Sequence, residues 1–383
     1  MTGFFDCAPR AFRPLVPVVL FVSFIVSSTA ADWRFALPGW LYEFPRDHRP
    51  HPEFKTEWWY FTGNLRVENG RRFGYQLTFF RQGIRPPVQR GSERSRFIVG
   101  DLKFAHFAVT DVASGRFHFE QALSRGAYGE AGFDAAELGR DVWRLAWIND
   151  WTLAMGGAQQ FELTARNKSA ELKLSLAPGK PWTIHGENGV SQKAAGEGHA
   201  SHYYSGTRLP TSGRVKLGGR ELYVEGESWF DHEWATNQLT PEQVGWNWFS
   251  IQLDDQTELM LYQMRTRDGG IDPNSSGTFV SAQGAAQHLR RDDYTLKPTK
   301  FWTSKATGGR YPIAWELAVP SLAIRLSIST PVENQELVLQ PIAYWEGLID
   351  VAGTRGGPAV RGHGYMELTG YAGELVGLSP TSR

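Results

Sequence analysis

An aromatic segment near the start of the chain recurs in the second half, and this repeat constrains the fold more than any other feature. The first copy, residues 57–65, reads Glu-Trp-Trp-Tyr-Phe-Thr-Gly-Asn-Leu, and the second, residues 246–253, reads Trp-Asn-Trp-Phe-Ser-Ile-Gln-Leu. When Trp58 is aligned on Trp246, Leu65 falls on Leu253. Each copy leads through a turn into another strand-like run. Two hairpins of one design predict a duplicated β-domain, with the two leucines at equivalent strand positions.

Short alternating apolar runs bounded by turn residues fill most of the chain. Residues 104–109, 142–148 and 151–155 read as strands, and Asn149-Asp150 between the last two is a hairpin turn. No long segment shows the 3.6-residue period of an amphipathic helix. Many short strands at regular spacing are typical of sandwiches and barrels, and barrels remove exposed strand edges. We therefore predict an all-β protein built from antiparallel barrels.

The length of 383 residues favours two domains. Residues 186–198 are rich in glycine, lysine and alanine and lack apolar periodicity, so they are interpreted as a linker. The predicted organisation is a signal segment at residues 1–31, a first β-domain at 32–195 and a second at 196–383.

The N-terminus has the pattern of a secretory signal. Arg10 and Arg13 precede an apolar run at residues 15–26, and small residues follow up to Ala31. The run is short for a membrane span, so we expect cleavage near Ala30 or Ala31 and a secreted or periplasmic protein that can contact a membrane but does not span one after cleavage. Cys7, the single cysteine, lies in this segment, so the mature chain has no disulfide and no cysteine nucleophile.

The composition argues against a nucleic-acid partner and favours an apolar one. Lys plus Arg and Asp plus Glu both number 40, which gives a formal net charge of zero and no strong attraction to a polyanion. The chain holds 15 tryptophans, several of them beside acidic residues. We expect a hydrophobic small molecule as partner and, because no nucleotide-binding glycine motif is present, no organic cofactor.

Three motifs carry a resemblance to a known family. They are His-Pro-Glu-Phe-Lys-Thr-Glu-Trp-Trp-Tyr at residues 51–60, Gly-Glu-Ser-Trp-Phe-Asp-His-Glu-Trp at 226–234, and Tyr-Trp-Glu-Gly at 344–347 with Gly-Tyr-Met-Glu-Leu-Thr-Gly-Tyr at 364–371. Together they resemble the AttH-like family. The resemblance implies two tandem lipocalin-like antiparallel β-barrel domains. Relatives include carotenoid 1,2-hydratases, which add water across a terminal isoprenoid double bond. Secreted bacterial members, commonly labelled secreted hydrolases, are the branch that this chain resembles more closely.

The densest group of ionisable residues is Asp231, His232 and Glu233, flanked by Trp229 and Trp234. Aromatic neighbours desolvate a carboxylate and raise its pKa, which makes it a usable general acid near neutral pH. On a regular strand Asp231 and Glu233 share one face while His232 points to the other, so the three converge only if a bulge turns the backbone. The alternative is a structural polar cluster with His232 buried.

The remaining site candidates are aromatic and acidic residues that the motifs place near this cluster. For Glu57 the alternative is a structural ion pair with an arginine such as Arg81, and Glu346 and Glu367 have a similar standing. The predicted substrate-binding residues are Glu57, Trp59, Tyr60, Tyr204, Trp229, Trp234, Trp248 and Glu346.

Two other chemistries find little support in the sequence. His199, His202 and His232 are candidates for a zinc set, but their spacing matches no zinc motif, and no metal is predicted. No Gly-x-Ser-x-Gly elbow is present, and an all-β fold does not suit the serine hydrolases that use one.

Two functions follow from these residues. The first is a cofactor-independent hydratase or hydrolase, in which an acid from the Asp231 cluster protonates an isoprenoid- or lipid-like substrate and His232 handles water. The second is a periplasmic carrier that shields an apolar ligand. They differ in whether the Asp231 cluster lines a solvent-reachable cavity or is sealed by ion pairs.

Overall fold

The computed structural model describes residues 33–89, 98–136, 142–339 and 342–373, together with residue 3. The predicted signal segment and its cleavage site therefore lie outside the described residues, apart from residue 3. Residues 32–383 form one compact unit. No helix among the described residues has the length and apolarity needed to cross a bilayer.

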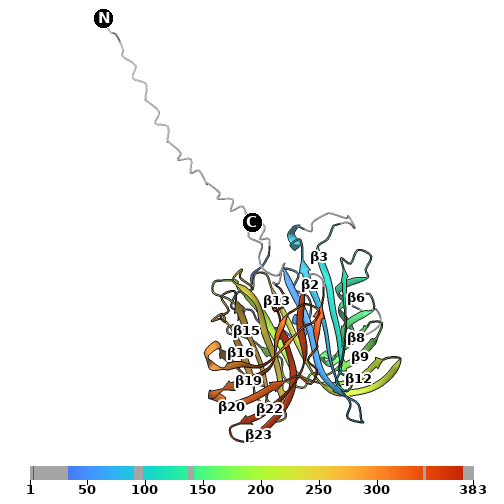
Figure 1. The fold of residues 1–383 in the computed structure, drawn as a ribbon. Coiled ribbons are helices and arrows are strands. Elements are labelled where there is room, and N and C mark those ends of the chain that lie inside the picture. Colours follow the sequence, from blue (N-terminus) through green and yellow to red (C-terminus); the bar gives the residue numbers. More distant parts are fainter. Residues whose placement is uncertain (1–2, 4–32, 90–97, 137–141, 340–341, 374–383) are drawn as a thin grey trace. The chain divides into compact units, whose positions relative to one another are not determined.

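Two antiparallel sheets make up this unit (Figure 1). The first has 13 strands in the order β4-β3-β2-β1-β13-β12-β9-β8-β7-β6-β5, with β10 and β11 also paired to β12. Its strands are β1 (Thr56–Arg66), β2 (Arg72–Gly83), β3 (Asp101–Asp111), β4 (Arg116–Ser124), β5 (Ala131–Ala136), β6 (Trp143–Ile148), β7 (Trp151–Met155), β8 (Phe161–Arg166), β9 (Ala170–Leu176), β10 (Thr183–Ile184), β11 (Ser191–Gln192), β12 (Ala200–Leu217) and β13 (Arg220–Ala235).

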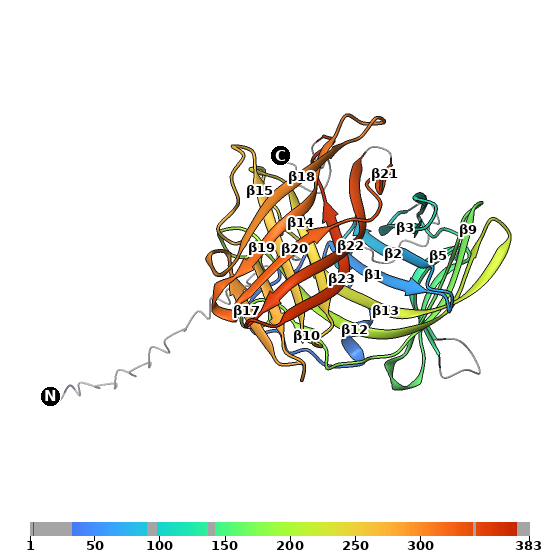
Figure 2. The same cartoon turned by 60° about the horizontal axis from the view of Figure 1, so that its bottom comes forward.

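The second sheet has 10 strands in the order β17-β16-β15-β14-β23-β22-β20-β19-β18, with β21 also paired to β22 (Figure 2). Its strands are β14 (Gln243–Leu253), β15 (Glu258–Thr266), β16 (Ser276–Val280), β17 (Ala286–Arg290), β18 (Thr295–Thr303), β19 (Arg310–Val319), β20 (Ile324–Ser329), β21 (Glu336–Val338), β22 (Ala343–Arg355) and β23 (Ala359–Leu368). Short 3₁₀ helices are η1 (Arg46–His48), η2 (Pro87–Gln89), η3 (Gly157–Gln159), η4 (Arg291–Asp293) and η5 (Pro320–Leu322).

Both sheets have the topology of an up-and-down barrel. The first strand of each pairs with the last, β1 with β13 and β14 with β23, and the free edges are strands consecutive in the chain, β4 with β5 and β17 with β18. One sheet nearly closes into a barrel and the other forms half of one, which confirms the predicted all-β fold.

The sequence repeat corresponds to equivalent strands. Leu65 lies in β1 and Leu253 in β14, and each of these strands is flanked by the following strand and by the last strand of its sheet. The register matches too, because Tyr60 pairs with Asp231 in the first sheet and Trp248, its counterpart in the repeat, pairs with Glu367 in the second. Asp231 and Glu367 are therefore equivalent positions.

The predicted domain boundary does not match the sheets. Strands β12 and β13 follow residue 196, yet both belong to the first sheet, so the chain changes sheet between Ala235 and Gln243. Residues 186–198 are not a free linker, because β11 pairs with β12 and the neighbouring Lys193 is only 6% exposed. The pairing of β13 with β1 joins segments far apart in the chain, which local periodicity does not reveal.

Alternation along the strands creates a core inside each sheet and a third core between them. On β1, Trp59 and Phe61 point into the first sheet, while Tyr60 points outward to the second. On β14, Phe249 points inward and Trp248 outward. The outward side chains of both sheets meet in one buried, largely aromatic cluster.

Polar contacts and a close backbone approach also join the two sheets. Arg208 and Lys180 both form buried ion pairs with Glu258 of β15, at 2.7 and 2.8 Å. A Cβ atom on Gly74 of β2 would lie 2.6 Å from the Tyr365 hydroxyl of β23, so only glycine permits this approach. These contacts explain why both sheets belong to one compact unit.

Candidate active site

A pocket lies between the two sheets, where their outward faces meet. Its cavity volume is about 140 Å³. An engineered cavity of about 150 Å³ in another protein binds benzene, so this space accommodates one ring or the end of a longer apolar chain. Some lining residues, among them Trp58, Gln82 and Trp246, are half-buried, and others, such as Tyr344 and Glu346, are buried.

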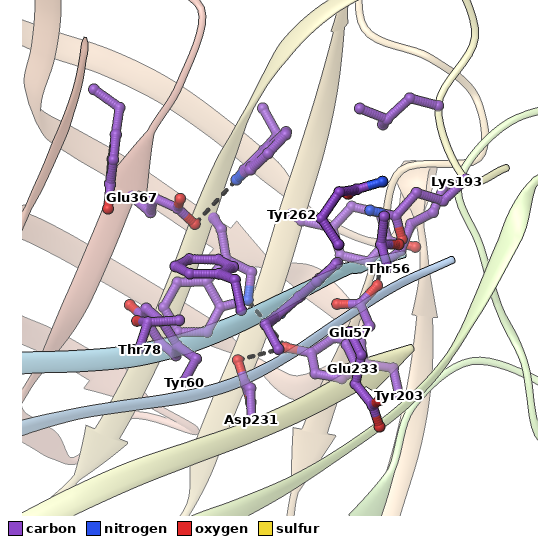
Figure 3. Close-up of a pocket in the computed structure, with 18 of the residues that line it drawn as sticks. Thr56, Glu57, Tyr60, Thr78, Lys193, Tyr203, Asp231, Glu233, Tyr262 and Glu367 are labelled. Atoms are coloured by element: carbon purple, nitrogen blue, oxygen red, sulfur yellow. Dashed lines mark hydrogen bonds and ion pairs between the residues drawn. The ribbon is translucent and has the colours of Figure 1, made fainter. Parts of the chain in front are cut away.

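Asp231 projects into this pocket from β13 and accepts three hydrogen bonds (Figure 3). The Tyr203 hydroxyl donates to Oδ2 at 2.8 Å, the Trp229 indole donates to Oδ1 at 2.6 Å, and the Ser205 hydroxyl also donates to Oδ1. Ser205 is in turn held by His185 Nε2 at 2.6 Å. Burial raises the pKa of Asp231 to about 7, although the three donors act in the opposite direction. Asp231 is thus available as acid or base near neutral pH.

The second sheet supplies a pair of glutamates, Glu346 on β22 and Glu367 on β23, which are direct register partners. The Trp246 indole donates to Glu367 Oε2 at 3.0 Å, and burial raises the pKa of Glu367 to about 7. Burial, with the neighbouring Glu367 charge, also raises the pKa of Glu346 well above its ordinary value. The Tyr60 and Tyr344 hydroxyls lie close enough to lower that pKa slightly, yet neither meets hydrogen-bond geometry with Glu346. Both shifts favour retention of a proton on this pair near neutral pH.

Glu233 forms a buried ion pair with Lys193. The Lys193 ammonium lies 3.2 Å from Glu233 Oε1 and 4.0 Å from the centroid of the Tyr262 ring. Burial alone would lower the lysine pKa, but Glu233 outweighs it and the pKa is raised. This ion pair with Lys193 does not favour the predicted role of Glu233 as a catalytic acid.

His232 points away from the pocket, into the first sheet. The register between β1 and β13 is unbroken, so no bulge brings His232 to the side of Asp231. Its Nε2 lies 2.9 Å from Glu57 Oε1, its Nδ1 lies 2.9 Å from the Asp47 carbonyl, and its ring stacks on Trp59 with centroids 4.6 Å apart. The predicted convergence of all three ionisable side chains is thus absent, because the strand keeps its alternation.

Glu57 is the centre of a buried network on that inner side. Arg81 Nε lies 3.0 Å from Oε2, and His51 Nδ1 lies 2.8 Å from Oε1. Burial would raise the Glu57 pKa, but Arg81 and the two histidines, His232 and His51, outweigh it and hold the pKa well below its usual range. The ion pair with Arg81 that the sequence suggested as the structural alternative is present.

One set of side chains in the described part of the chain has the spacing of metal ligands, namely His51, Glu57 and His232. Both histidine nitrogens lie within 2.9 Å of Glu57 Oε1, a hydrogen-bond distance. Two ligands on a tetrahedral zinc at about 2.1 Å would stand farther apart, at roughly 3.4 Å. Hydrogen bonds from the two histidines to Glu57 explain these short distances. His199 and His202, which the sequence analysis considered as zinc ligands, are not part of this set.

The pocket contains some of the predicted residues and not others. The predicted residues that line it are Glu57, Tyr60, Asp231, Glu233, Trp248 and Glu346. Those that do not line it are Trp59, Tyr204, Trp229, His232 and Trp234. Trp229 nevertheless holds Asp231 by a hydrogen bond.

Sequence reasoning missed two lining residues of note, Lys193 and Tyr262. The repeat offered a signal for Tyr262. Tyr262 pairs with Trp248, the counterpart of Tyr60 in the repeat, in the same way that Thr78 pairs with Tyr60. Lys193 lies in the expected linker and offered none.

Comparisons with known proteins agree with this fold. The crystal structure of a protein assigned as AttH from Nitrosomonas europaea is 31% identical, covers 88% of this chain and 99% of that chain, and has a TM-score of 0.77. Kievitone hydratase from Nectria haematococca is 12% identical, covers 89% of this chain and 98% of that chain, and shares the fold with a TM-score of 0.65.

A dehydratase, asqC of Emericella nidulans, is 24% identical over 196 residues, or 48% of this chain. The match spans 54% of the dehydratase, about half its length. The family model described as AttH-like matches residues 36–371, nearly the whole described chain. The chain therefore belongs to the AttH-like family.

Proposed function

We propose that the pocket is the active site of a cofactor-independent hydro-lyase, which adds water to, or removes it from, an apolar substrate. One observation carries the proposal. Carboxyl groups from both sheets, Asp231 on one side and Glu346 with Glu367 on the other, line one aromatic pocket with raised pKa values, about 7 for Asp231 and Glu367. The names of the similar dehydratase and hydratase support the same reaction class.

The chemistry needs one protonated and one ionised carboxyl group, and the pocket supplies both. In the hydration direction a carboxylic acid transfers its proton to one alkene carbon, and positive charge develops on the other. Water attacks that carbon, and the proton it sheds goes to the second carboxylate. The sum is one water consumed, with one proton given and one regained by the protein. In the dehydration direction the same groups exchange roles.

The environments of the carboxyl groups differ in a way that assigns these roles. Three hydrogen bonds to Asp231 stabilise its carboxylate, whereas the Tyr60 and Tyr344 hydroxyls only approach Glu346, whose pKa stays well above its ordinary value. Glu346 is therefore the acid and Asp231 the base. The Trp58 and Trp248 rings in the lining stabilise positive charge through their electron-rich faces.

We also propose that the protein is exported, on the N-terminal pattern, and meets its substrate outside the cytoplasm. A carrier would use the same pocket and bind without turnover. A hydrolase would release two products by the same acid and base. The raised carboxyl pKa values favour the hydro-lyase, because a carrier of an apolar ligand has no use for three desolvated acids.

The test follows water oxygen. Unsaturated isoprenoids and the tertiary alcohols that correspond to them would be incubated with the protein in ¹⁸O-labelled water and analysed by mass spectrometry. We expect ¹⁸O in the alcohol with the wild-type protein, and a loss of at least about 100-fold in Asp231→Asn.

Glu225→Gln is the matched control, since Glu225 lies on the same strand but is exposed. Saturable binding without label would leave the carrier as the function, and labelled products of bond cleavage would identify a hydrolase.

A further inference from the structure

The buried lining of the pocket holds polar atoms that lack a well-formed hydrogen bond. The Tyr60 hydroxyl and both carboxyl oxygens of Glu346 are buried, and although Tyr60 and Tyr344 lie near Glu346, none of these three atoms reaches hydrogen-bond geometry with a described residue. Both residues line the pocket, and they are 7% and 2% exposed. Folded proteins rarely leave buried polar groups unpaired, because each costs about 1–3 kcal/mol.

We infer that Tyr60 and Glu346 form a subsite for the hydroxyl group of a neutral ligand, and that this subsite rejects ligands with an anionic head group. A hydroxyl both donates and accepts hydrogen bonds. It can accept from the Tyr60 phenol while it donates to a Glu346 oxygen, or accept from a protonated Glu346. An ether or carbonyl oxygen only accepts, and so satisfies fewer of these atoms.

The surroundings of the subsite disfavour anions. A carboxylate or phosphate on the ligand would be buried in a desolvated space without a cation to pair with it, which is costly. The two cations in the lining, Lys193 and Arg81, already form ion pairs with Glu233 at 3.2 Å and with Glu57 at 3.0 Å. Fatty acids and isoprenoid phosphates are thus poor ligands, whereas phenols and isoprenoid alcohols are suitable.

This inference goes beyond the proposed function, because it concerns recognition and holds equally for a carrier. It places the ligand oxygen between the two sheets, with Tyr60 on β1 and Glu346 on β22. Turnover and recognition share Glu346, but two other variants separate them: Asp231→Asn should abolish labelling and keep the binding preference, whereas Tyr60→Phe should weaken the preference itself. Absence of ¹⁸O labelling would not affect the binding preference, and loss of that preference would not prevent labelling.

Isothermal titration calorimetry at pH 6.5 with three probes of one shape tests the inference. The probes are 2-naphthol, 2-naphthoate and 2-methylnaphthalene, which present a hydroxyl, a carboxylate and a methyl group on a ring that the cavity accommodates, while the second ring extends toward the half-buried part of the lining. We expect the wild-type protein to bind 2-naphthol at least about tenfold more tightly than either of the others. Tyr60→Phe and Glu346→Gln should each weaken 2-naphthol about tenfold and leave 2-methylnaphthalene unchanged.

Tyr75→Phe is the matched control, because it removes a buried hydroxyl that contacts Ser228 and does not line the pocket. If one of the two variants fails to fold by circular dichroism, the other and the three wild-type affinities still decide. Equal affinity for 2-naphthol and 2-naphthoate would overturn the inference. So would unchanged 2-naphthol binding in the folded variants, or no binding of any probe.

Discussion

Asp231 and His232 are neighbours in the chain, yet they belong to different environments. The unbroken pairing of β13 with β1 directs Asp231 into the pocket and His232 into the first sheet. Asp231 is desolvated next to a space that a ligand can enter, while His232 is enclosed by fixed partners. A single strand thus separates a candidate reacting group from a structural one.

The raised pKa of Asp231 predicts how stability depends on pH. Burial raises this pKa from 3.8 to about 7, so between those values the folded protein holds a proton that the unfolded chain has lost. The stabilisation that this proton gives the folded state is fully present below pH 3.8 and is lost as the pH rises through about 7. Between pH 5 and 8 this contribution falls by about 3 kcal/mol.

Asparagine does not ionise, so the Asp231→Asn variant lacks this pH-dependent loss of stability. Its free energy of unfolding relative to that of the wild type should therefore rise from pH 5 to pH 8. Urea unfolding of both proteins at pH 5 and pH 8 measures it. Parallel pH dependence of the two proteins would show that Asp231 titrates in its ordinary range.

His232→Ala should destabilise the protein strongly and not act as a simple loss of a catalytic group. The change removes a partner of the buried Glu57 carboxylate and the ring that stacks on Trp59. We expect a loss of about 3 kcal/mol or more in the free energy of unfolding, measured by denaturant titration. His118→Ala, in the edge strand β4, is the control and should cost far less. An unchanged midpoint for His232→Ala would return His232 to the list of catalytic candidates.

Strands were predictable from the sequence where local alternation carried the information. The hairpin at Asn149-Asp150 is confirmed by β6 and β7, and the repeat correctly matched β1 with β14. The domain boundary and Lys193 could not be found in this way. The boundary depends on the pairing of β13 with β1, which are far apart in the chain and leave no local signal of it. Lys193 follows β11, a strand of only two residues, which is too short to show a periodic pattern.

The candidate site was predictable in part for the same reason. The sequence predicts Asp231, Tyr60 and Glu346 as site residues because they lie in dense aromatic and acidic motifs, and all three line the pocket. Which face each would occupy depended on the register, and the sequence left open the bulge that His232 needed. The absence of that bulge in β13 excludes His232 from the pocket.

The segment that carries β11 is held in place by its lysine. Lys193→Met should leave the Glu233 carboxylate buried without its cation, which costs about 3–5 kcal/mol. The double replacement Lys193→Met with Glu233→Met should recover most of this loss, because no uncompensated charge remains. Guanidinium unfolding of the wild type, both single variants and the double variant completes the cycle. Additive losses would mean that the two side chains do not act as a pair.

At the scale of the whole molecule, the site exists only because two related sheets meet. Asp231 and Glu367 are equivalent positions of the repeat, and the buried cluster between the sheets draws on both. Neither sheet alone would enclose the pocket.

Each sheet should therefore need the other to stay soluble and monomeric. Residues 32–236 contain all strands of the first sheet, but alone they would expose the outward aromatic face that includes Tyr60, Tyr203 and Trp229. We expect this half to self-associate or precipitate, whereas residues 32–383 stay monodisperse in size-exclusion chromatography with light scattering. A soluble, monomeric and cooperatively folding half would contradict the dependence.

The central claim is that a carboxyl group in this pocket holds a proton near neutral pH. ¹³C NMR titration of the aspartate and glutamate side-chain carboxyls, with Asp231→Asn to assign the signal, tests it most directly. The structure predicts a midpoint for Asp231 close to 7, together with coupled titration of a second pair of carboxyls that Glu346→Gln removes. A midpoint for Asp231 near 4, the ordinary value for aspartate, would contradict the account.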